Sequence, residues 1–507
     1  YARFLCQTVR QVIPALSTTY KRKYNDGDYM RHELREARAD ISKPLTASNV
    51  RIGIVSSRLA SSFMEGKLFS NLVYKTSRKQ GGLFHVTFFD VSKGLNPRDG
   101  IFSVLKESLD RIIMIRPSVK YKMADIIAKY TKDIDVLIFV APSRDETVYW
   151  LAQNRLVSTQ VAVWAGSSSP GITGTIDYFV SADNMLGKEA YTLFEGQVVR
   201  LRGCGVYIPP LMYHMPSTVS PDAQPRYSYL NGSLILFARY THVLIPVHSI
   251  SIIHPSFDRV ITNIIEKSQD VVVLLVDESN HQWAQAGIQR LASRIRSTVD
   301  LKNTRRLITV PSMPRAEFLS LTRASTLILD PVDINEGSSE QMYYTAFESL
   351  TIGTPVVTYE PLHANTSSIL VNSVPSLLRS IELSPEIESL IAHSEAEIVD
   401  TALSITQNAS KRKHITDYLR KVSKHVVQDT RTLRDWQIFL HRAGRGSQAL
   451  RLAASETGGK GGRQKRKAWN LMKEKPIKAD DYVAAFCRVV FILYFASCWC
   501  IFYLRFH

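Results

Sequence analysis

Residues 307–359 read LITV, PSMPRAEFLSLTRAS, TLILDP, VDINEGSSEQ, MYYTAFESLTI and GTPVVTY. Three short β-branched runs alternate with two segments of helical periodicity, which is the pattern of a parallel α/β sheet. Ligands of such sheets bind beyond the carboxyl ends of the strands. Asp330 lies at one such end, and the helix after it carries Thr345 and, one turn later, Glu348. A helix start offers unpaired N–H groups to phosphate, so this arrangement suits a sugar nucleotide.

The net charge of +17 would indicate a nucleic-acid partner if it were spread over the folded part of the chain. It is concentrated instead, because residues 442–478 hold eleven Lys or Arg residues against Glu456 and Glu474, which is about half of the excess. That segment is rich in glycine and poorly patterned. We therefore expect no nucleic-acid partner.

The final residues, 482–504, form an apolar run that contains only Arg488 and Ser497 as charged or clearly polar residues, and it is long enough to cross a bilayer. Together with the basic stretch before it, the run predicts a membrane helix attached to a cytosolic body. An amphipathic or buried terminal helix and a reading-frame error are the alternatives. Only Cys6 and Cys204 lie outside this run, which is no disulfide framework and favours a reducing compartment.

Two stretches of alternating strand and helix patterns are joined by a segment rich in Pro, Ser and Tyr. The first stretch predicts strands at VRIGIVSS, HVTFFDVS, DIDVLIFVA, VAVWAG, DYFVSAD and VVRL, and the second at SLILFARY, VVVLLVD, LITV, TLILDP and PVVTY. The expected segments are a helical end of an upstream region at 1–47, two Rossmann-like domains at 48–225 and 226–385, C-terminal helices at 386–440, a basic flexible linker at 441–480 and the apolar segment at 481–507.

Two doubly wound units facing a cleft define the α/β architecture called GT-B, the two-domain glycosyltransferase fold, and this is the fold class that we predict. Two-domain dehydrogenases and periplasmic binding proteins share the outline. The first strand is not followed by the G-x-G-x-x-G of dinucleotide enzymes, because only Gly66 lies in that region. The sequence shows no export signal, and we expect it to be a fragment of a longer chain.

Several pieces of the chain, in order, resemble the catalytic region of O-linked N-acetylglucosamine transferases, especially the plant, algal and bacterial members with tetratricopeptide repeats upstream. The pieces are RIGIVSS with a later GKL, RDETVYWLAQNRLVSTQVAVWAG, GTIDYFVSAD, IIHPSFDRVITNIIEKSQDVVVLL, VPSMPRAEFLSLTRASTLILDP and AFESLTIGTPVVT. The resemblance implies inverting transfer of N-acetylglucosamine from a UDP donor to Ser or Thr of an intracellular acceptor protein. It also implies no metal and no cofactor, because helix starts and basic side chains stabilise the departing diphosphate.

The resemblance also assigns roles to single residues. Glu348 matches the acidic residue that holds the ribose, and Thr345 matches a hydroxyl residue near the diphosphate. Arg315 matches the loop that shapes the base pocket. Lys67 is expected to face the diphosphate or the acceptor, and His254 is a candidate at the start of a helix.

The loop of residues 164–174, WAGSSSPGITG, lies between two runs that read as buried strands. Ser169 and Gly171 in this loop supply a hydroxyl and a backbone donor suited to sugar or phosphate oxygens. We therefore expect both residues to bind substrate at the cleft.

The chain departs from active relatives at three basic positions. Residues 62–65 and 167–170 lack a His that relatives carry, and Ile252 replaces a Lys that neutralises the diphosphate. Loss of that Lys removes a charge-assisted contact worth about 1.5–3 kcal/mol, and Lys67 or His248 are the expected replacements. No catalytic residue can be named from the sequence. The alternative is a catalytically degraded protein that binds a nucleotide or a partner at a membrane.

Overall fold

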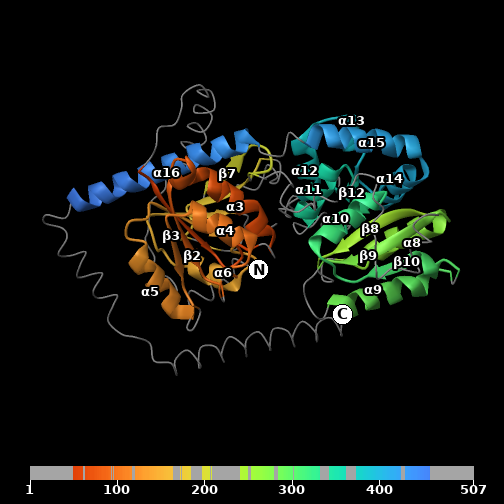
Figure 1. Ribbon diagram of the computed structural model, residues 1–507, viewed down its shortest axis with the longest axis horizontal. Coiled ribbons are helices and arrows are strands. Elements are labelled where there is room, and N and C mark those ends of the chain that lie inside the picture. The colour runs from red at the N-terminus through yellow and green to blue at the C-terminus, as the bar shows by residue number, and fades with distance from the viewer. Residues whose placement is uncertain are drawn as a thin grey trace, which may run out of the picture.

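The computed structural model shows two parallel α/β domains side by side (Figure 1). It describes residues 49–60, 63–92, 94, 96–116, 120–163, 172, 174–183, 197–205, 207, 240–248, 253–278, 284–300, 302–331, 342–360, 373–423 and 429–456. Because each domain is a doubly wound sheet and the two lie beside each other, the predicted GT-B fold class is confirmed.

The first domain has a seven-stranded parallel sheet with the order β3-β2-β1-β4-β5-β6-β7. Its strands are β1 (Arg51–Ser56), β2 (His85–Asp90), β3 (Arg111–Met114), β4 (Val136–Val140), β5 (Thr159–Val163), β6 (Tyr178–Ala182) and β7 (Gln197–Leu201). Its helices are α3 (Met64–Thr76), the 3-10 helix η2 (Arg78–Gln80), α4 (Gly100–Ser108), α5 (Lys120–Tyr130) and α6 (Glu146–Ala152).

The second domain has a six-stranded sheet with the order β10-β9-β8-β11-β12-β13, in which the strands again run parallel. Its strands are β8 (Thr241–Val247), β9 (Val271–Asp277), β10 (Leu307–Val310), β11 (Leu327–Leu329), β12 (Val356–Tyr359) and β13 (Ile391–Ala392). Its helices are α8 (Phe257–Lys267), α9 (Ala284–Thr298), the 3-10 helix η7 (Thr304–Arg306), α10 (Arg315–Ala324), α11 (Met342–Ile352), α12 (Ser373–Ile381), α13 (Pro385–Glu388), α14 (Glu395–Gln407) and α15 (Ala409–Val422).

The central strands are apolar because both faces of each sheet are covered. Every residue of β4 and of β9 is buried. On one face of the first sheet Phe69 and Leu105 belong to the core that α3 and α4 complete, and on the other face Met123 and Leu151 contribute from α5 and α6. Helices on both faces leave the strand ends as the open edge, which is where ligands bind in such sheets.

After α15 the chain returns to the first domain as α16 (Thr430–Glu456), which Figure 1 shows in blue along that domain. The helix packs against α3, β4, β5 and β7. Asp435 accepts three hydrogen bonds from Arg202, from its backbone N (3.0 Å), its Nε (3.0 Å) and its Nη2 (2.8 Å). Trp436 Nε1 donates to the Gly205 carbonyl at 2.8 Å. These bonds tie the helix to the segment that leaves β7.

Three strands were not among the sequence predictions. We expected a strand at SLILFARY, of which only Tyr240 lies within the described residues, whereas the central strand β8 follows it. Pro246 sits inside β8, and a proline inside a run argues against a central strand because it has no N–H to donate. Strands β3 and β13 were missed because they are short edge strands of four and two residues.

The expected flexible linker at 441–480 is wrong for its first part, because α16 is continuous through residue 456. Glycines in this segment suggested flexibility, but Gly444 serves close packing of the helix instead. A Cβ on Gly444 would lie 2.2 Å from a methyl carbon of Val50, so glycine allows the helix to lie close to the start of β1. The rest of the linker, the segment at 1–47 and the apolar segment at 481–507 lie outside the described residues.

Within the described part of the chain, no helix is long and apolar enough to cross a membrane. The predicted membrane helix at 482–504 lies outside that part, so it stays a prediction.

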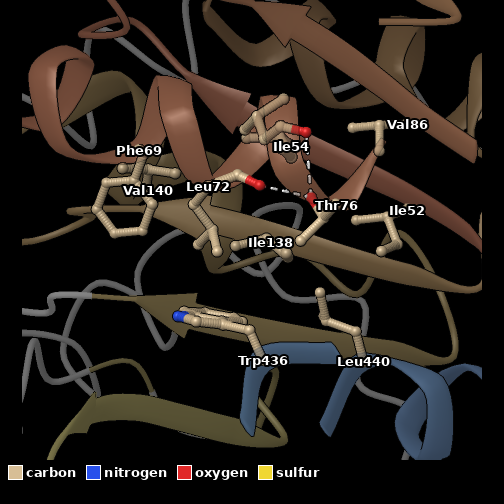
Figure 2. Close-up of a pocket in the computed structure, with 11 residues that line it drawn as sticks. Ile52, Ile54, Phe69, Leu72, Thr76, Val86, Ile138, Val140, Trp436 and Leu440 are labelled. Atoms are coloured by element: carbon tan, nitrogen blue, oxygen red, sulfur yellow. Dashed lines mark hydrogen bonds between the residues drawn. The ribbon is translucent and has the colours of Figure 1, made fainter. Parts of the chain in front are cut away.

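A small cavity of about 20 Å³ lies between α3, the first sheet and α16 (Figure 2). Trp436 and Leu440 point into it from α16, opposite Leu72 of α3. Thr76, the polar residue of the lining, donates its hydroxyl to the Leu72 carbonyl at 2.8 Å. The volume holds roughly one water molecule and the lining is apolar, so this cavity is a packing gap rather than a ligand site.

Replacing Asp435 with Ala is expected to lower the free energy of unfolding by about 2–3 kcal/mol, because charge-assisted bonds to a fully buried carboxylate are lost. The matched control is Asp133→Ala, which removes an ion pair with Arg51 in which the Asp133 side chain is 74% exposed. That change should stay within about 0.5 kcal/mol of the parent. Urea unfolding of both variants measures the difference, and equal effects would contradict the role of Asp435.

Candidate active site at the facing strand ends

Both sheets change strand order at one point, between β1 and β4 in the first domain and between β8 and β11 in the second. The loops that leave these strands diverge to opposite faces, so each switch point forms a crevice. Arg58 and Arg144 follow β1 and β4, whereas His248 and Asp330 follow β8 and β11. The polar residues described below lie around these two crevices.

On the side of the first domain, the buried carboxylate of Glu65 lies between two arginines. Its Oε1 is 3.2 Å from Arg58 Nε and 3.6 Å from Arg144 Nη1. The Glu65 side chain is 1% exposed, whereas that of Arg144 is 19% exposed. Ser57 donates a hydrogen bond to Asp145, which also caps α6 through the backbone N–H of Val148. Because one carboxylate faces two guanidinium groups, Glu65, Arg58 and Arg144 together carry one positive charge.

Lys67 extends from α3 toward the second domain, where its Nζ lies 4.8 Å from the centre of the Tyr344 ring on α11. Gly66 precedes it because a Cβ there would lie 2.1 Å from the Ala60 carbonyl oxygen. Burial, and next the positive charge of Arg315, lower the pKa of Lys67 to about 8, against a smaller opposing effect of Glu278. A lysine in this state still carries charge at neutral pH and is easily deprotonated.

On the side of the second domain, Arg315 bridges two carboxylates. Its Nε donates to Glu348 Oε1 at 3.2 Å, and its Nη1 donates to Glu278 at the end of β9. Glu348 is 1% exposed, so the Arg315 charge compensates for its burial. Burial raises the pKa of Glu278, while Arg315 and Lys67 oppose that rise. The Arg315 guanidinium also lies 4.6 Å from the centre of the Phe318 ring.

His248 and Thr345 meet between these charged groups. Thr345 Oγ1 lies 3.3 Å from His248 Nε2, at the first turn of α11. Burial first, and then the positive charges of Arg315, Lys67 and Arg144 in that order, lower the pKa of His248 to about 3. The imidazole is therefore neutral at pH 7, so the expectation that His248 replaces the missing cation is wrong, and Lys67 is left as the expected replacement.

Two contacts between the domains lie beside this cluster. Tyr343 donates its hydroxyl to the Cys204 carbonyl at 3.3 Å, and Ser380 on α12 donates to the Gly203 carbonyl at 3.4 Å. Burial raises the pKa of the Cys204 thiol to about 12, so that thiol is not a nucleophile at neutral pH. These contacts hold α11 and α12 against the segment that follows β7.

Five of the residues predicted from the sequence gather here, namely Lys67, His248, Arg315, Thr345 and Glu348. The ribose role predicted for Glu348 stays a prediction, because in this structure its carboxylate is paired with Arg315.

Of the other three predicted residues, only His254 lies within the described part of the chain, and it does not join this group. His254 is an exposed residue at the start of α8, with its Nδ1 2.8 Å from Ser256 Oγ. Ser169 and Gly171 lie outside the described residues.

The sequence analysis missed four charged members of the site, Arg58, Glu65, Arg144 and Glu278. Three of them follow a strand directly or within a few residues, at SSR after β1, APSR after β4 and DE at the end of β9. The rule that ligands bind at strand ends would have found these three positions. Glu65 could not be found in this way, because its role depends on the two arginines that fold against it.

Among the residues that the structure describes, no group of three or more His, Cys, Asp or Glu side chains could hold a metal ion. Metal independence of the chemistry stays a prediction.

Comparison with solved structures identifies the fold class. No protein-family model and no curated protein sequence matches the chain. Among solved structures, an O-GlcNAc transferase mutant from Thermobaculum terrenum aligns with a TM-score of 0.62 at 18% identity, over 88% of this chain and 78% of that one. A glycosyltransferase from Rickettsia africae aligns with a TM-score of 0.51 at 14% identity, over 78% of this chain and 99% of that one. The chain thus has the fold of GT-B glycosyltransferases.

Acetylation of Lys67 by acetic anhydride is expected to follow a pH profile with its midpoint near 8 rather than near 10.5. The Arg315→Gln variant removes a neighbouring positive charge and leaves Glu278 uncompensated, so its midpoint should rise. Mass spectrometry of the peptide that contains Lys67 measures the profile, with Arg323→Gln on the same helix as the control. A parent midpoint near 10.5, or one that does not move in Arg315→Gln, would contradict the environment described for Lys67.

Proposed function

We propose that this protein is a glycosyltransferase that uses a nucleotide-sugar donor, with UDP as the nucleotide. The observation that carries the proposal is the contact of Lys67 from the first domain with Tyr344 on α11 of the second. Arg315 also lies against the Tyr344 ring, and the neighbouring Thr345 contacts His248, at the carboxyl ends of two facing sheets. A donor bound across this place has its phosphates beside cations and beside the start of α11. Anions are stabilised at such a place by helix N–H groups and by positive side chains.

In this proposal the second domain supplies the contacts to the nucleotide-sugar. The Thr345 hydroxyl lies at the first turn of α11, where it can donate to a phosphate oxygen. Neutral His248 accepts or donates a hydrogen bond beside it without repelling the three surrounding cations. Glu348 accepts from the ribose hydroxyls when Arg315 keeps Glu278 as its remaining partner. Arg315 and Phe318 form the wall against which the base rests.

The reaction in this proposal is a single inverting displacement. The bond from the anomeric carbon of the sugar to the diphosphate oxygen breaks, and its electron pair leaves with UDP. A hydroxyl of the acceptor attacks the opposite face of the same carbon, forms the new glycosidic bond and passes its proton to water. Preorganised cations stabilise the negative charge that develops on the departing diphosphate. Lys67 lies where it can supply such a charge without a metal ion.

The finer proposal is transfer of N-acetylglucosamine to Ser or Thr of an acceptor protein by a cytosolic body. The ordered sequence pieces that resemble O-linked N-acetylglucosamine transferases support it. The fold shared with the Thermobaculum terrenum O-GlcNAc transferase is consistent with it. Upstream tetratricopeptide repeats and membrane attachment through residues 482–504 belong to this finer proposal as well.

A second candidate function is nucleotide or partner binding without catalysis. It is favoured by the pairing of Arg315 with both Glu278 and Glu348, which occupies the carboxylate that a ribose would need. The replacement of a lysine of active relatives by Ile252 points in the same direction.

Transfer by the full chain from a panel of radiolabelled UDP-sugars to peptides rich in Ser and Thr tests the enzyme proposal. Turnover with at least one donor is expected. Calorimetry with UDP separates the two candidates, because binding heat without transfer or donor hydrolysis favours the non-catalytic one. Absence of both binding and turnover would reject both candidates.

Replacing Thr345 with Val is expected to weaken UDP binding about 5- to 10-fold, because one hydrogen bond near the phosphates is lost. Thr351→Val is the matched control on the same helix, since that hydroxyl donates to the Glu348 carbonyl at 2.8 Å inside α11. Calorimetry of both variants measures the change. Equal affinities in Thr345→Val and the parent would argue against phosphates at the start of α11.

A further inference from the structure

Tyr344 on α11 contacts one cation from each of the two domains. Its ring centre lies 4.8 Å from Lys67 Nζ of the first domain and 5.8 Å from the guanidinium carbon of Arg315 in the second. Both distances fall within the range of about 6 Å over which the face of an aromatic ring attracts a cation. The Tyr344 ring is therefore a direct contact between the domains at the candidate site.

The Lys67 amine has no polar partner to fix its position. Among the described residues it donates no hydrogen bond and forms no ion pair. Burial, and next the charge of Arg315, act against its charged form, with a smaller opposing effect of Glu278. A lysine carries its charge on a flexible four-carbon stem, so an amine without a partner would turn toward water. The contact with the Tyr344 ring is what keeps the amine at α11.

The Tyr344 ring is fixed in place, whereas its hydroxyl has no partner. The residue is 7% exposed, and its ring packs on Phe347 of the same helix with 6.4 Å between the ring centres. The hydroxyl forms no hydrogen bond with any residue that the structure describes. Burial raises the pKa of Tyr344 to about 12, against the effect of Arg315, so the phenol is neutral at pH 7. The contact with Lys67 is therefore one between a cation and a neutral ring.

The place of this contact indicates the ligand that the amine would meet. Tyr344 directly precedes Thr345 in the first turn of α11, so a measured contact places Lys67 Nζ beside the helix start at which the phosphates are proposed to bind. An ammonium group has three N–H donors, and Lys67 uses none of them within the described part of the chain. A diphosphate at this place supplies both acceptors and an opposite charge.

We propose that Tyr344 is a positioning residue of the interdomain site, whose ring holds the Lys67 amine at the first turn of α11, where that amine binds the diphosphate of the nucleotide. Tyr344 acts through Lys67 and not through its own hydroxyl. This inference rests on the proposed function. It adds the residue of the second domain that orients the cation of the first.

The experiment is a double-mutant cycle on UDP binding, measured by calorimetry with the full chain. Tyr344→Leu keeps a buried apolar side chain but removes the ring, and we expect the UDP affinity to fall about 3- to 10-fold. Tyr344→Phe keeps the ring and should restore the affinity to within about 2-fold of the parent. In the Lys67→Gln background, Tyr344→Leu should change the affinity less than about 2-fold, because the amine that the ring orients is absent.

The matched control is Tyr74→Leu, which removes the ring of another lysine–tyrosine contact on α3, with Lys75 Nζ 5.7 Å from the ring centre. It should leave the UDP affinity unchanged. Thermal unfolding checks that each variant is folded, and Tyr344→Met is the second variant without a ring if Tyr344→Leu does not fold.

Three results would overturn the assignment: an equal fall with and without Lys67, which indicates a packing role of the ring; an equal fall in Tyr344→Phe, which indicates a role of the hydroxyl; and no fall in a folded variant without the ring. Each of them leaves the proposed function standing, because the parent still binds UDP. A parent that binds no UDP would overturn the proposed function and this assignment with it.

Discussion

The return of α16 to the first domain is the constraint on which the site depends. The chain enters the second domain after β7, builds a complete second sheet and comes back, so the two domains are joined twice. Asp435 and Trp436 bind Arg202 and Gly205 near the first crossing, and Tyr343 binds the Cys204 carbonyl beside them. Because these contacts are adjacent, the strand ends of the two sheets are held facing each other.

This constraint explains why charged side chains are buried at the interface. A charge removed from water is costly unless an opposite charge compensates for it. The site meets that requirement unevenly, because Arg315 has Glu278 and Glu348 as partners whereas Glu65 is shared by Arg58 and Arg144. Arg315 with its two carboxylates leaves an excess of one negative charge in the second domain, whereas Arg58 and Arg144 with Glu65 leave an excess of one positive charge in the first. Lys67 adds a further positive charge on the side of the first domain. An anionic ligand beside these first-domain cations complements this distribution.

The sequence predicted the fold class because strand ends and helix starts are local patterns. It also named five of the residues that meet in the candidate site, partly through the resemblance, and their binding roles stay predictions. Thr345 and Glu348 follow from the pattern of one helix after one strand. The strand β8 was missed because Pro246 interrupts its pattern, and α16 was cut short because Gly444 suggested a loop rather than a close contact with Val50. The Arg315 bridge and the Glu65 cluster depend on contacts between distant segments, 33 residues apart for Arg315 and Glu348, which no local pattern contains.

Hydrogen–deuterium exchange of the full chain, with and without saturating UDP, tests the central claim most directly, because it reports where the nucleotide binds. With UDP bound, we expect slower exchange in all three of these segments: the first turn of α11, the residues that follow β4 and the start of α3. Protection confined to one domain, or no protection anywhere at a UDP concentration that saturates binding, would contradict a nucleotide site between the two domains.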